Sequence, residues 1–317
     1  MISLDDVNRA RETIGGRLHR TPTFSSATLS KLAGADVHLK AELFQRTGSF
    51  KPRGVLNKLA SLSAEEKQRG LIGISAGNHA QALAYAAALE GLDALVVMWS
   101  DASAQKVEAA RGYGATVDLE APDKTEAFAR LAALIEETGR TLVHPFDDPI
   151  VQAGQGTVGL ELLEDVEADL VVVPIGGGGL IAGVSTAVKG RRPNARVIGV
   201  EPVNSAAMHA ALAGGEPVLV EAESFADGLN APFAGPNALE VARERVDEVV
   251  LVTEAELEEG FRFLYRRAKL AVEGAGAAST AALLAGKIEH EQGERVALIV
   301  SGGNVAAETA SAILASR

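Results

Sequence analysis

The chain has 317 residues, of which 47% are hydrophobic and 23% charged, so it can bury a large core and is not of the disordered class. Its length suits one large domain or two modest ones. The formal net charge of −12 argues against binding to a nucleic-acid backbone, and no Lys/Arg-rich run offsets it. The absence of cysteine excludes disulfides, thiolate metal ligands and a cysteine nucleophile. Neither a signal-peptide pattern nor an apolar run of membrane-spanning length occurs, so we expect a cytoplasmic protein without a membrane partner.

Short runs rich in β-branched residues alternate with Ala-rich segments along most of the chain. The runs have the length and composition of buried parallel strands, and the Ala-rich segments are typical of helices. The predicted strands are 93–98, 169–175, 195–200, 248–252 and 295–300. The predicted helices are 78–89, 102–111, 124–137 and 254–269. This alternation predicts an α/β protein with doubly wound sheets.

The pattern is interrupted at residues 144–149, which contain two prolines and two adjacent aspartates. No Pro/Ser-rich linker divides the rest of the chain. We therefore expect a second domain to be inserted into the first, with one junction near these residues.

Lys51 lies between Phe50 and Pro52 in a segment that begins with Gly48 and Ser49. A lysine that forms an imine must spend time neutral, and an apolar neighbour favours the neutral amine by desolvation. Pro52 suits the first turn of a helix, whose positive end would further disfavour the ammonium. From these residues alone, a solvated surface lysine remains the alternative.

Four consecutive glycines, 176–179, follow the predicted strand 169–175 and precede a helix predicted from Leu180. Their N–H groups and the helix N-terminus would form a cradle for a phosphate group, whereas the turn itself needs only one glycine. The looser dinucleotide fingerprint fits as well, because Ala182 follows at the right spacing and Glu201 ends the next predicted strand. The segment alone leaves open a nicotinamide dinucleotide and a smaller phosphate ligand.

Two further polar loops follow predicted strands. Residues 75–79 follow a short apolar strand predicted at 71–74 and open a predicted helix, where Ser, Asn and free N–H groups suit a carboxylate. Simple capping of that helix by Ser75 or Asn78 is the alternative. Ser301 comes directly after the last predicted strand, where its hydroxyl would meet a heterocyclic nitrogen or cap a loop.

Taken together and in this order, these segments resemble the fold-type II (tryptophan synthase β-like) enzymes that use pyridoxal 5′-phosphate (PLP), and among them the threonine/serine dehydratases and serine racemases. The resemblance runs from about His19 to Asn304. It rests on the motifs FQRTGSFKPRG (44–54), SAGNHAQ (75–81), HPFDDPIVQAGQGT (144–157), PIGGGGLIAG (174–183) and SGGN (301–304). It implies a large PLP-binding domain built from 1–62 and 148–317, with a small α/β domain, 63–147, inserted in it. It also argues against a nicotinamide dinucleotide as the ligand, since such an enzyme would give no role to Lys51 or Ser301.

The resemblance implies roles for individual residues. Lys51 would hold PLP as a Schiff base and remove the Cα proton of an amino-acid substrate. Asn78 would bond the 3′-oxygen of the cofactor and Ser301 its pyridine nitrogen, while the glycines bind its phosphate, our candidate acid for the leaving hydroxyl. The residues expected to bind the cofactor are Phe50, Lys51, Asn78, Gly176, Gly177, Gly178, Gly179, Gly228, Glu273 and Ser301. The residues expected to hold the substrate carboxylate are Ser75, Ala76, Gly77, Asn78 and His79.

The implied reaction is α,β-elimination from L-threonine or L-serine, which gives 2-oxobutyrate or pyruvate and ammonia. Racemases of this family carry a serine as second acid/base where this chain has Ala76, and a methyl group cannot return a proton to Cα. We therefore expect dehydration rather than serine or aspartate racemisation. Dehydration of 3-hydroxyaspartate, a nicotinamide-dependent oxidoreductase and a noncatalytic binder of PLP or amino acids are the alternatives to be tested.

Metal-binding relatives use two carboxylates and a backbone carbonyl after the strand that ends here in Glu201. Ser205 would supply the carbonyl, but Ala207 stands where the second carboxylate is expected. The loss of a charged oxygen ligand weakens a divalent site, so a divalent ion is in doubt and a monovalent cation stays open. The chain ends at Arg317, and we expect no C-terminal regulatory domain. The relatives also imply a homodimer or homotetramer.

Overall fold

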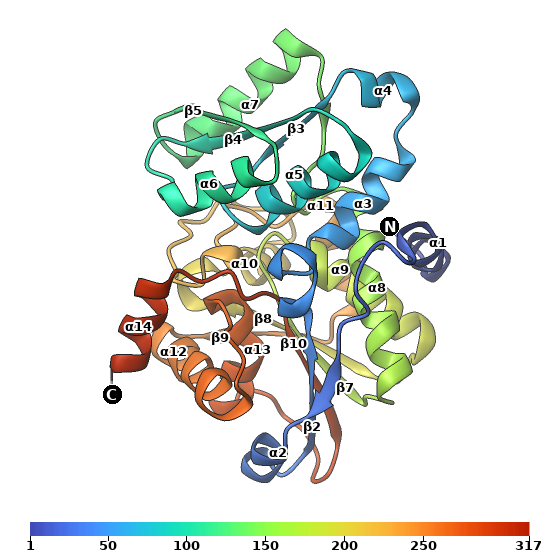
Figure 1. Cartoon of the computed structure of the whole chain (residues 1–317). Helices are drawn as coiled ribbons and strands as arrows, with labels where there is room; N and C mark the ends of the chain where they lie inside the picture. Colours follow the sequence, from blue (N-terminus) through green and yellow to red (C-terminus); the bar gives the residue numbers. More distant parts are fainter. Residues whose placement is uncertain (317) are drawn as a thin grey trace.

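A computed structural model describes residues 1–316 and confirms the predicted α/β architecture. Six strands form one sheet in the order β1-β2-β10-β7-β8-β9, and four form another in the order β5-β4-β3-β6. The chain enters the four-stranded sheet after β2 and returns to the six-stranded sheet at β7. Figure 1 shows the four-stranded sheet with its helices above the six-stranded sheet. The predicted domain boundaries at 62/63 and 147/148 stay a prediction.

The elements have the following bounds. The strands are β1 (Thr23–Ser25), β2 (Asp36–Ala41), β3 (Leu71–Ile74), β4 (Ala94–Trp99), β5 (Thr116–Ala121), β6 (Thr141–Leu142), β7 (Leu170–Pro174), β8 (Arg196–Pro202), β9 (Glu248–Val252) and β10 (Arg295–Val300). The α-helices are α1 (Leu4–Ile14), α2 (Ala27–Ala33), α3 (Pro52–Ser61), α4 (Ala64–Gln68), α5 (Asn78–Glu90), α6 (Ala104–Gly112), α7 (Lys124–Thr138), α8 (Pro149–Asp165), α9 (Gly179–Arg191), α10 (Ala207–Gly214), α11 (Pro236–Arg245), α12 (Glu254–Phe263), α13 (Gly274–Leu284) and α14 (Ala307–Ala315).

The six-stranded sheet is buried on both faces, which explains the continuous apolar runs in its strands. In β7, Leu170 and Val172 pack in one core cluster with residues of α12 and α13. The alternate residues Val171 and Val173 pack in a second cluster with residues of α9 and α11. Full burial of each such side chain contributes about 1.5–3 kcal/mol to folding. The four-stranded sheet is covered in the same way, by α5 and α6 on one face and by α7 on the other.

The helical segment predicted over 254–269 is confirmed to within one residue, but only its first part is α-helical. The α-helix α12 ends at Phe263 and continues as a π-helical turn, Leu264–Ala268. The N–H groups of Lys269 and Leu270 both donate to Leu264 O, which widens the last turn, and Lys269 has a φ of 62°.

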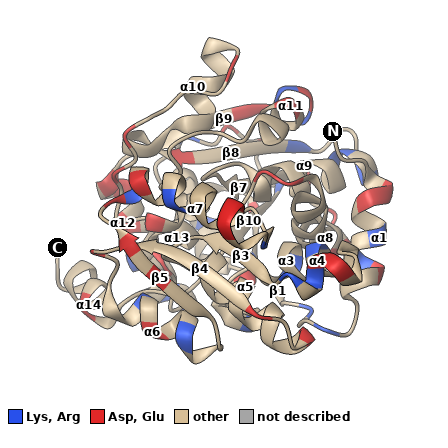
Figure 2. Cartoon of the chain, turned by 90° about the horizontal axis from the view of Figure 1, so that it is seen from above, with Lys and Arg blue, Asp and Glu red and all other residues tan. Residues whose placement is uncertain are grey.

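Within residues 1–316, no helix combines the length and the apolar character needed to cross a bilayer. Figure 2 shows Lys and Arg interspersed with Asp and Glu over the outer helices and loops. The formal net charge of −12 gives this surface an acidic excess, and the expectation of no nucleic-acid partner stays a prediction.

The strand order brings the predicted motifs to one edge of the six-stranded sheet. The neighbouring strands β2, β10, β7 and β8 run parallel, so their carboxyl ends lie side by side. The segments after β2, β10 and β7 carry Lys51, Ser301 and the glycines 176–179, and β8 carries Glu201 near its end. This is the edge at which open α/β sheets bind their ligands.

Candidate active site

Lys51 is presented by a loop that lies against the segment following β10. The Phe50 N–H donates to Ser301 O (3.2 Å), and the Gly303 N–H donates to Gly48 O (2.9 Å). These bonds act like a short antiparallel ladder between the two segments. They fix the lysine loop to the carboxyl end of the central strand β10.

The Lys51 side chain is half-buried, and the pKa of its amine is lowered. Lys51 is the N-cap residue of α3, with Pro52 in the first helical position as predicted. Its Nζ donates to Pro145 O (2.8 Å) and lies 5.2 Å from the centre of the Phe50 ring. Burial lowers the pKa of Lys51 to about 8, although the Glu273 carboxylate opposes this shift. The alternative of a solvated surface lysine is therefore wrong, and the neutral amine needed for attack on a carbonyl is accessible near neutral pH.

The glycines 176–179 form the turn between β7 and α9. Gly178 has a φ of 97°, which glycine adopts readily. A Cβ at Gly177 would lie 2.3 Å from the Phe146 ring, and one at Gly179 would lie 2.8 Å from Phe146 O. Among the residues described, no side chain caps the N-terminus of α9, so its first N–H groups are open to an anion. The contacts with Phe146 explain why positions 177 and 179 are glycines, whereas the open N-terminus of α9 is what fits the predicted phosphate role, which stays a prediction.

The loop 75–79 joins β3 to α5. The N-cap residue is Gly77, and no side chain within 1–316 caps the helix, so the alternative of capping by Ser75 or Asn78 is wrong. Ser75 Oγ instead accepts a hydrogen bond from the Gly77 N–H (3.0 Å). The uncapped N–H groups suit a substrate carboxylate, while the Ala76 methyl group is buried.

The His79 ring is buried and contacts the backbone that follows β6. Its Nε2 lies 2.8 Å from Val143 O, and the residue is only 2% exposed. Burial lowers the pKa of His79 to about 3, so the ring is neutral. These contacts indicate a structural imidazole, and a substrate role for His79 stays a prediction that concerns its backbone.

Glu273 and Asn78 meet at the same site. Asn78 Nδ2 donates to Glu273 Oε1 (2.7 Å), and a Cβ at Gly228 would lie 3.7 Å from that oxygen. Burial and then the nearby Asp227 carboxylate raise the pKa of Glu273 to about 8. Gly228 also lies close to the glycine turn, since a Cβ added at Gly176 would be 3.1 Å from Gly228 O. The structure thus brings together the predicted cofactor residues Phe50, Lys51, Asn78, Gly176, Gly177, Gly178, Gly179, Gly228, Glu273 and Ser301.

Glu201 is fully buried and engaged with the next helix. Its carboxylate accepts hydrogen bonds from the N–H groups of Met208 and His209, both at 2.8 Å, at the start of α10. Burial raises the pKa of Glu201 to about 7. Ser205 Oγ donates to Leu229 O (2.9 Å). In the described part of the chain no three His, Cys, Asp or Glu side chains gather as metal ligands, and the cation role of Glu201 and Ser205 stays a prediction.

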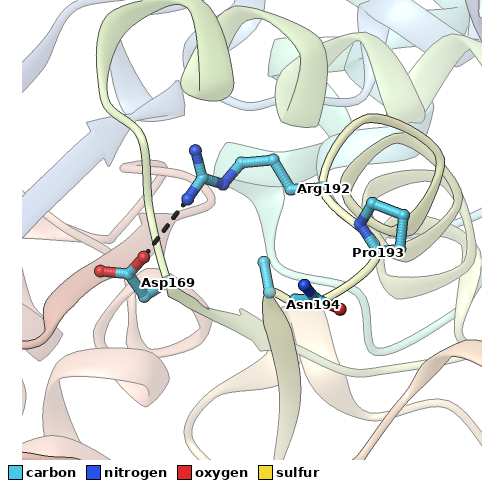
Figure 3. A pocket seen from close by; sticks show the side chains of 5 residues that line it. Asp169, Arg192, Pro193 and Asn194 are labelled. Atoms are coloured by element: carbon cyan, nitrogen blue, oxygen red, sulfur yellow. Dashed lines mark hydrogen bonds and ion pairs between the residues drawn. The ribbon is translucent and has the colours of Figure 1, made fainter.

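A surface pocket of about 200 Å³ lies away from this site (Figure 3). It is lined by Asp169, Arg192, Pro193, Asn194 and Ala195. Asp169 directly precedes β7 and Ala195 directly precedes β8, so the pocket lies at the amino ends of the strands. Arg192 donates to Asp169 there (3.3 Å). The pocket therefore contributes no group to the Lys51 site.

Comparison with known proteins identifies the family. A family model described as "Pyridoxal-phosphate dependent enzyme" matches residues 15–302. The chain belongs to this family. The fold and the resemblance predicted from the motifs are thereby confirmed.

Several relatives of this PLP-dependent family are similar over nearly the whole chain. The L-threonine ammonia-lyase of Thermotoga maritima is 44% identical over 307 residues, which cover 96% of this chain and 76% of the relative. The L-threonine dehydratase catabolic TdcB of Staphylococcus aureus is 44% identical over 312 residues, covering 96% and 90%. The solved structure of the T.th. threonine deaminase has a TM-score of 0.90 at 43% identity, covering 96% and 99%. That of maize serine racemase has a TM-score of 0.93 at 36% identity, covering 97% and 95%.

The residues present fit the PLP of the family. The open N-terminus of α9 matches a phosphate group, and Lys51 matches an aldehyde carbon. Among residues 1–316, the hydroxyls of Ser49 and Thr47 are buried without a hydrogen-bond partner. Unpartnered buried hydroxyls next to Lys51 in the sequence fit a polar ligand at this site.

Three features of the site are absent from the predictions made from sequence. The Pro145 carbonyl holds Lys51 Nζ, and a backbone carbonyl has no sequence signal. Lys106 of α6 forms an ion pair with Asp227, which precedes Gly228, and links helices of the four-stranded sheet to the site. Asn304 bonds Asn78, and its place in the SGGN motif was the only available signal.

Proposed function

We propose that this chain is a PLP-dependent L-threonine/L-serine ammonia-lyase that forms 2-oxobutyrate or pyruvate and ammonia by α,β-elimination. The observation that carries the proposal is Lys51, a half-buried lysine with a pKa lowered to about 8, in contact with the loops that end β10 and precede α8. Relatives named L-threonine ammonia-lyase and L-threonine dehydratase, at 44% identity over 96% of the chain, support it.

The site residues divide the work of binding. The N–H groups that open α9 would hold the cofactor phosphate, and Phe50 would flank its ring. Asn78 and Ser301 would hydrogen-bond the 3′-oxygen and the ring nitrogen. The N–H groups that open α5 would hold the substrate carboxylate, which the helix dipole favours.

Proton transfer falls to Lys51. PLP, when bound, supplies an electron sink for the Cα of an amino acid. A neutral Lys51 Nζ can take the Cα proton, and its lowered pKa makes that state common near pH 8. The leaving hydroxyl needs a proton as well, for which the phosphate held by residues 176–179 is our candidate donor.

A racemase on the same scaffold is the second candidate, because the maize serine racemase structure is similar over 97% of the chain. Racemisation needs an acid on the face of Cα opposite to Lys51. Ala76 occupies the position at which racemases of the family carry a serine, and its buried methyl group cannot donate a proton. Elimination is therefore favoured, with Lys51 as the single Cα base.

The proposal is tested by incubating pure protein and PLP with L-threonine, L-serine and 3-hydroxyaspartate, followed by assay of 2-oxo acids and chiral analysis of the remaining amino acid. We expect 2-oxobutyrate and ammonia from L-threonine, and less than about 1% of the turnovers as racemisation, given that a missing general acid costs 10²–10⁴-fold. Lys51→Ala abolishes product, whereas Lys31→Ala, at an exposed position of α2, does not. No 2-oxo acid from any of the three substrates would sink the proposal.

A visible absorption band that borohydride abolishes would separate this enzyme from a nicotinamide-dependent oxidoreductase, and turnover would separate it from a noncatalytic binder.

We further propose a cytoplasmic homodimer or homotetramer, with residues 63–147 as the inserted domain. Light scattering on the eluted protein tests the assembly. A PLP titration with and without added K⁺ or Mg²⁺ tests the cation.

A further inference from the structure

The Asn304 amide connects the lysine loop with α5. Its Nδ2 donates two hydrogen bonds, to Thr47 O (2.7 Å) and to Asn78 Oδ1 (2.7 Å). Asn78 in turn donates from Nδ2 to Glu273 Oε1 (2.7 Å). Four residues that are distant in sequence thus form one hydrogen-bond chain that ends at the Lys51 site.

The direction of this chain follows from chemistry rather than from the assignment of amide atoms. Thr47 O is a backbone carbonyl and can only accept, so the Asn304 atom that faces it must be the NH₂ group. The same NH₂ faces Asn78, so the facing atom of Asn78 must be its oxygen. The NH₂ of Asn78 is then the atom that is turned to Glu273. Asparagine orientations are decided by networks of this kind.

The backbone of the lysine loop is shaped for the contact with Asn304. Thr47 has a φ of 61°, and among residues 1–316 it shares a positive φ outside glycine only with Lys269. A bulky residue in this region is held there by its surroundings, and such residues cluster at binding sites. Next to it, a Cβ at Gly48 would lie 2.5 Å from Asn304 Oδ1, so the amide packs closely against the glycine.

We propose that Asn304 is a positioning residue, which holds the Asn78 amide so that its NH₂ group is presented to the cofactor site. The inference rests on the proposed function, because the group that Asn78 would meet is the 3′-oxygen of PLP. An oxygen ligand needs a donor. Without Asn304 the Asn78 amide can rotate by half a turn and present its oxygen, which repels the ligand oxygen. Asn304 is itself exposed, so its removal takes little packing from the core.

A double-mutant cycle on PLP affinity tests the proposal, with the ratio of the two absorption bands of the bound cofactor as a second readout. Asn304→Ala should weaken PLP binding by about tenfold, the effect of losing one oriented hydrogen bond. Asn304→Asp keeps the shape but cannot donate, and should weaken binding at least as much. In the Asn78→Ala background, Asn304→Ala should change the affinity by less than about twofold, because Asn304 acts through Asn78. Asn194→Ala, at an exposed position remote from the site, is the matched control.

Either of two results would overturn the proposal: an Asn304→Ala affinity within twofold of the wild type, or independent, multiplying effects of the two substitutions. Thermal unfolding of each apo variant shows whether a loss of affinity reflects a loss of folding. If Asn304→Ala unfolds, the isosteric Asn304→Asp variant replaces it in the affinity measurement. Binding of PLP without 2-oxo acid formation would refute the proposed function and leave the positioning role standing. If wild-type protein binds no PLP, the side-chain ¹⁵N resonances of Asn78 in apo protein decide: an unchanged signal in Asn304→Ala refutes the orientation.

Discussion

Lys51 and Glu273 illustrate how burial changes the chemistry of single residues. A lysine and a glutamate are both charged in water at pH 7, yet burial lowers the pKa of one and raises the pKa of the other, to about 8 in each case. The site therefore holds groups that exchange protons near neutral pH. Such perturbed groups at the carboxyl edge of a sheet are what a proton-transferring enzyme requires.

Uptake of PLP by the apo protein should depend on the protonation of Lys51. A pKa of about 8 instead of 10.5 leaves roughly 300-fold more neutral amine at pH 7 than an ordinary lysine has. We expect the uptake rate, followed by stopped-flow absorbance, to rise with pH and to level off above about 8. The same reaction with a free lysine derivative should keep rising to pH 10. A flat profile for the protein between pH 6 and 9 would contradict the shift.

Glu273→Gln should change the pH dependence of stability. Because the pKa of the folded state is raised from 4.5 to about 8, Glu273 contributes stability that is present below pH 4.5 and is lost as the pH rises through 8. Gln keeps the oxygen that accepts from Asn78 and cannot ionise. We expect the free energy of unfolding of apo Glu273→Gln to gain on that of the wild type between pH 5 and 8, by up to a few kcal/mol. Urea titrations at several pH values measure this, and a constant difference would rule it out.

The lysine loop is anchored at the level of elements by a buried ion network. Arg53 of α3 bonds Glu42 after β2 (2.8 Å) and Glu161 of α8 (2.7 Å), and Lys40 of β2 also bonds Glu161 (2.9 Å). Arg53, Lys40 and Glu42 are at most 1% exposed. The network joins β2, α3 and α8 around the start of the helix that follows Lys51. It also explains why β2 does not read as a strand, since its buried Lys40 is balanced by Glu161, far along the chain.

Arg53→Met should destabilise the protein strongly. It leaves the buried Glu42 without its basic partner and takes one of two cations from the half-buried Glu161, and breaking a buried pair from one side costs about 3–5 kcal/mol. Arg9→Met is the matched control, because the Arg9–Asp6 pair has an arginine side chain that is 68% exposed and such pairs contribute about 0–1 kcal/mol. Denaturant unfolding of the two variants compares them. Equal losses would show that the network does not anchor the loop.

The two sheets meet around the site, and one ion pair joins their surroundings directly. Lys106 belongs to α6, which covers the four-stranded sheet, and Asp227 lies in the 3₁₀ turn Asp227–Leu229 beside the six-stranded sheet. Both charges act on Glu273, whose pKa Asp227 raises and Lys106 lowers. The pair therefore joins α6 to the turn beside the six-stranded sheet, and the same two charges set the pKa of Glu273.

Lys106→Ala should weaken substrate binding more than it slows turnover. The pair is partly exposed, at 36% and 47%, so its loss is worth about 0–1 kcal/mol, or up to about fivefold in KM. The wild-type advantage should shrink at high salt, which screens exposed charges. Arg111→Ala, which breaks the Arg111–Glu108 pair within α6, is the control. A Lys106→Ala variant with unchanged KM at low salt would contradict the coupling.

The local sequence was sufficient to predict the elements that are apolar on both faces. The strands β4, β7, β8, β9 and β10 read as strands because burial on both faces of a sheet demands uninterrupted β-branched runs. The π-helical turn after Phe263 could not be predicted, because nothing in the helical pattern marks a widened turn. Strand β2 could not be predicted either, because its buried Lys40 is paired with Glu161, 121 positions away.

The sequence by itself determined which chemical groups this protein brings to its site. A reactive lysine, a run of four glycines and polar residues after strands are required as residue types, and their order is legible in the motifs. Only the tertiary structure decided how these groups are held: the Pro145 carbonyl on Lys51 Nζ, the orientation of Asn78 by Asn304, and the pairing of Lys106 with Asp227. These contacts join residues about 90 to 230 positions apart, and hydrogen bonds and ion pairs of a few ångströms at such separations arise from packing, which local patterns do not encode.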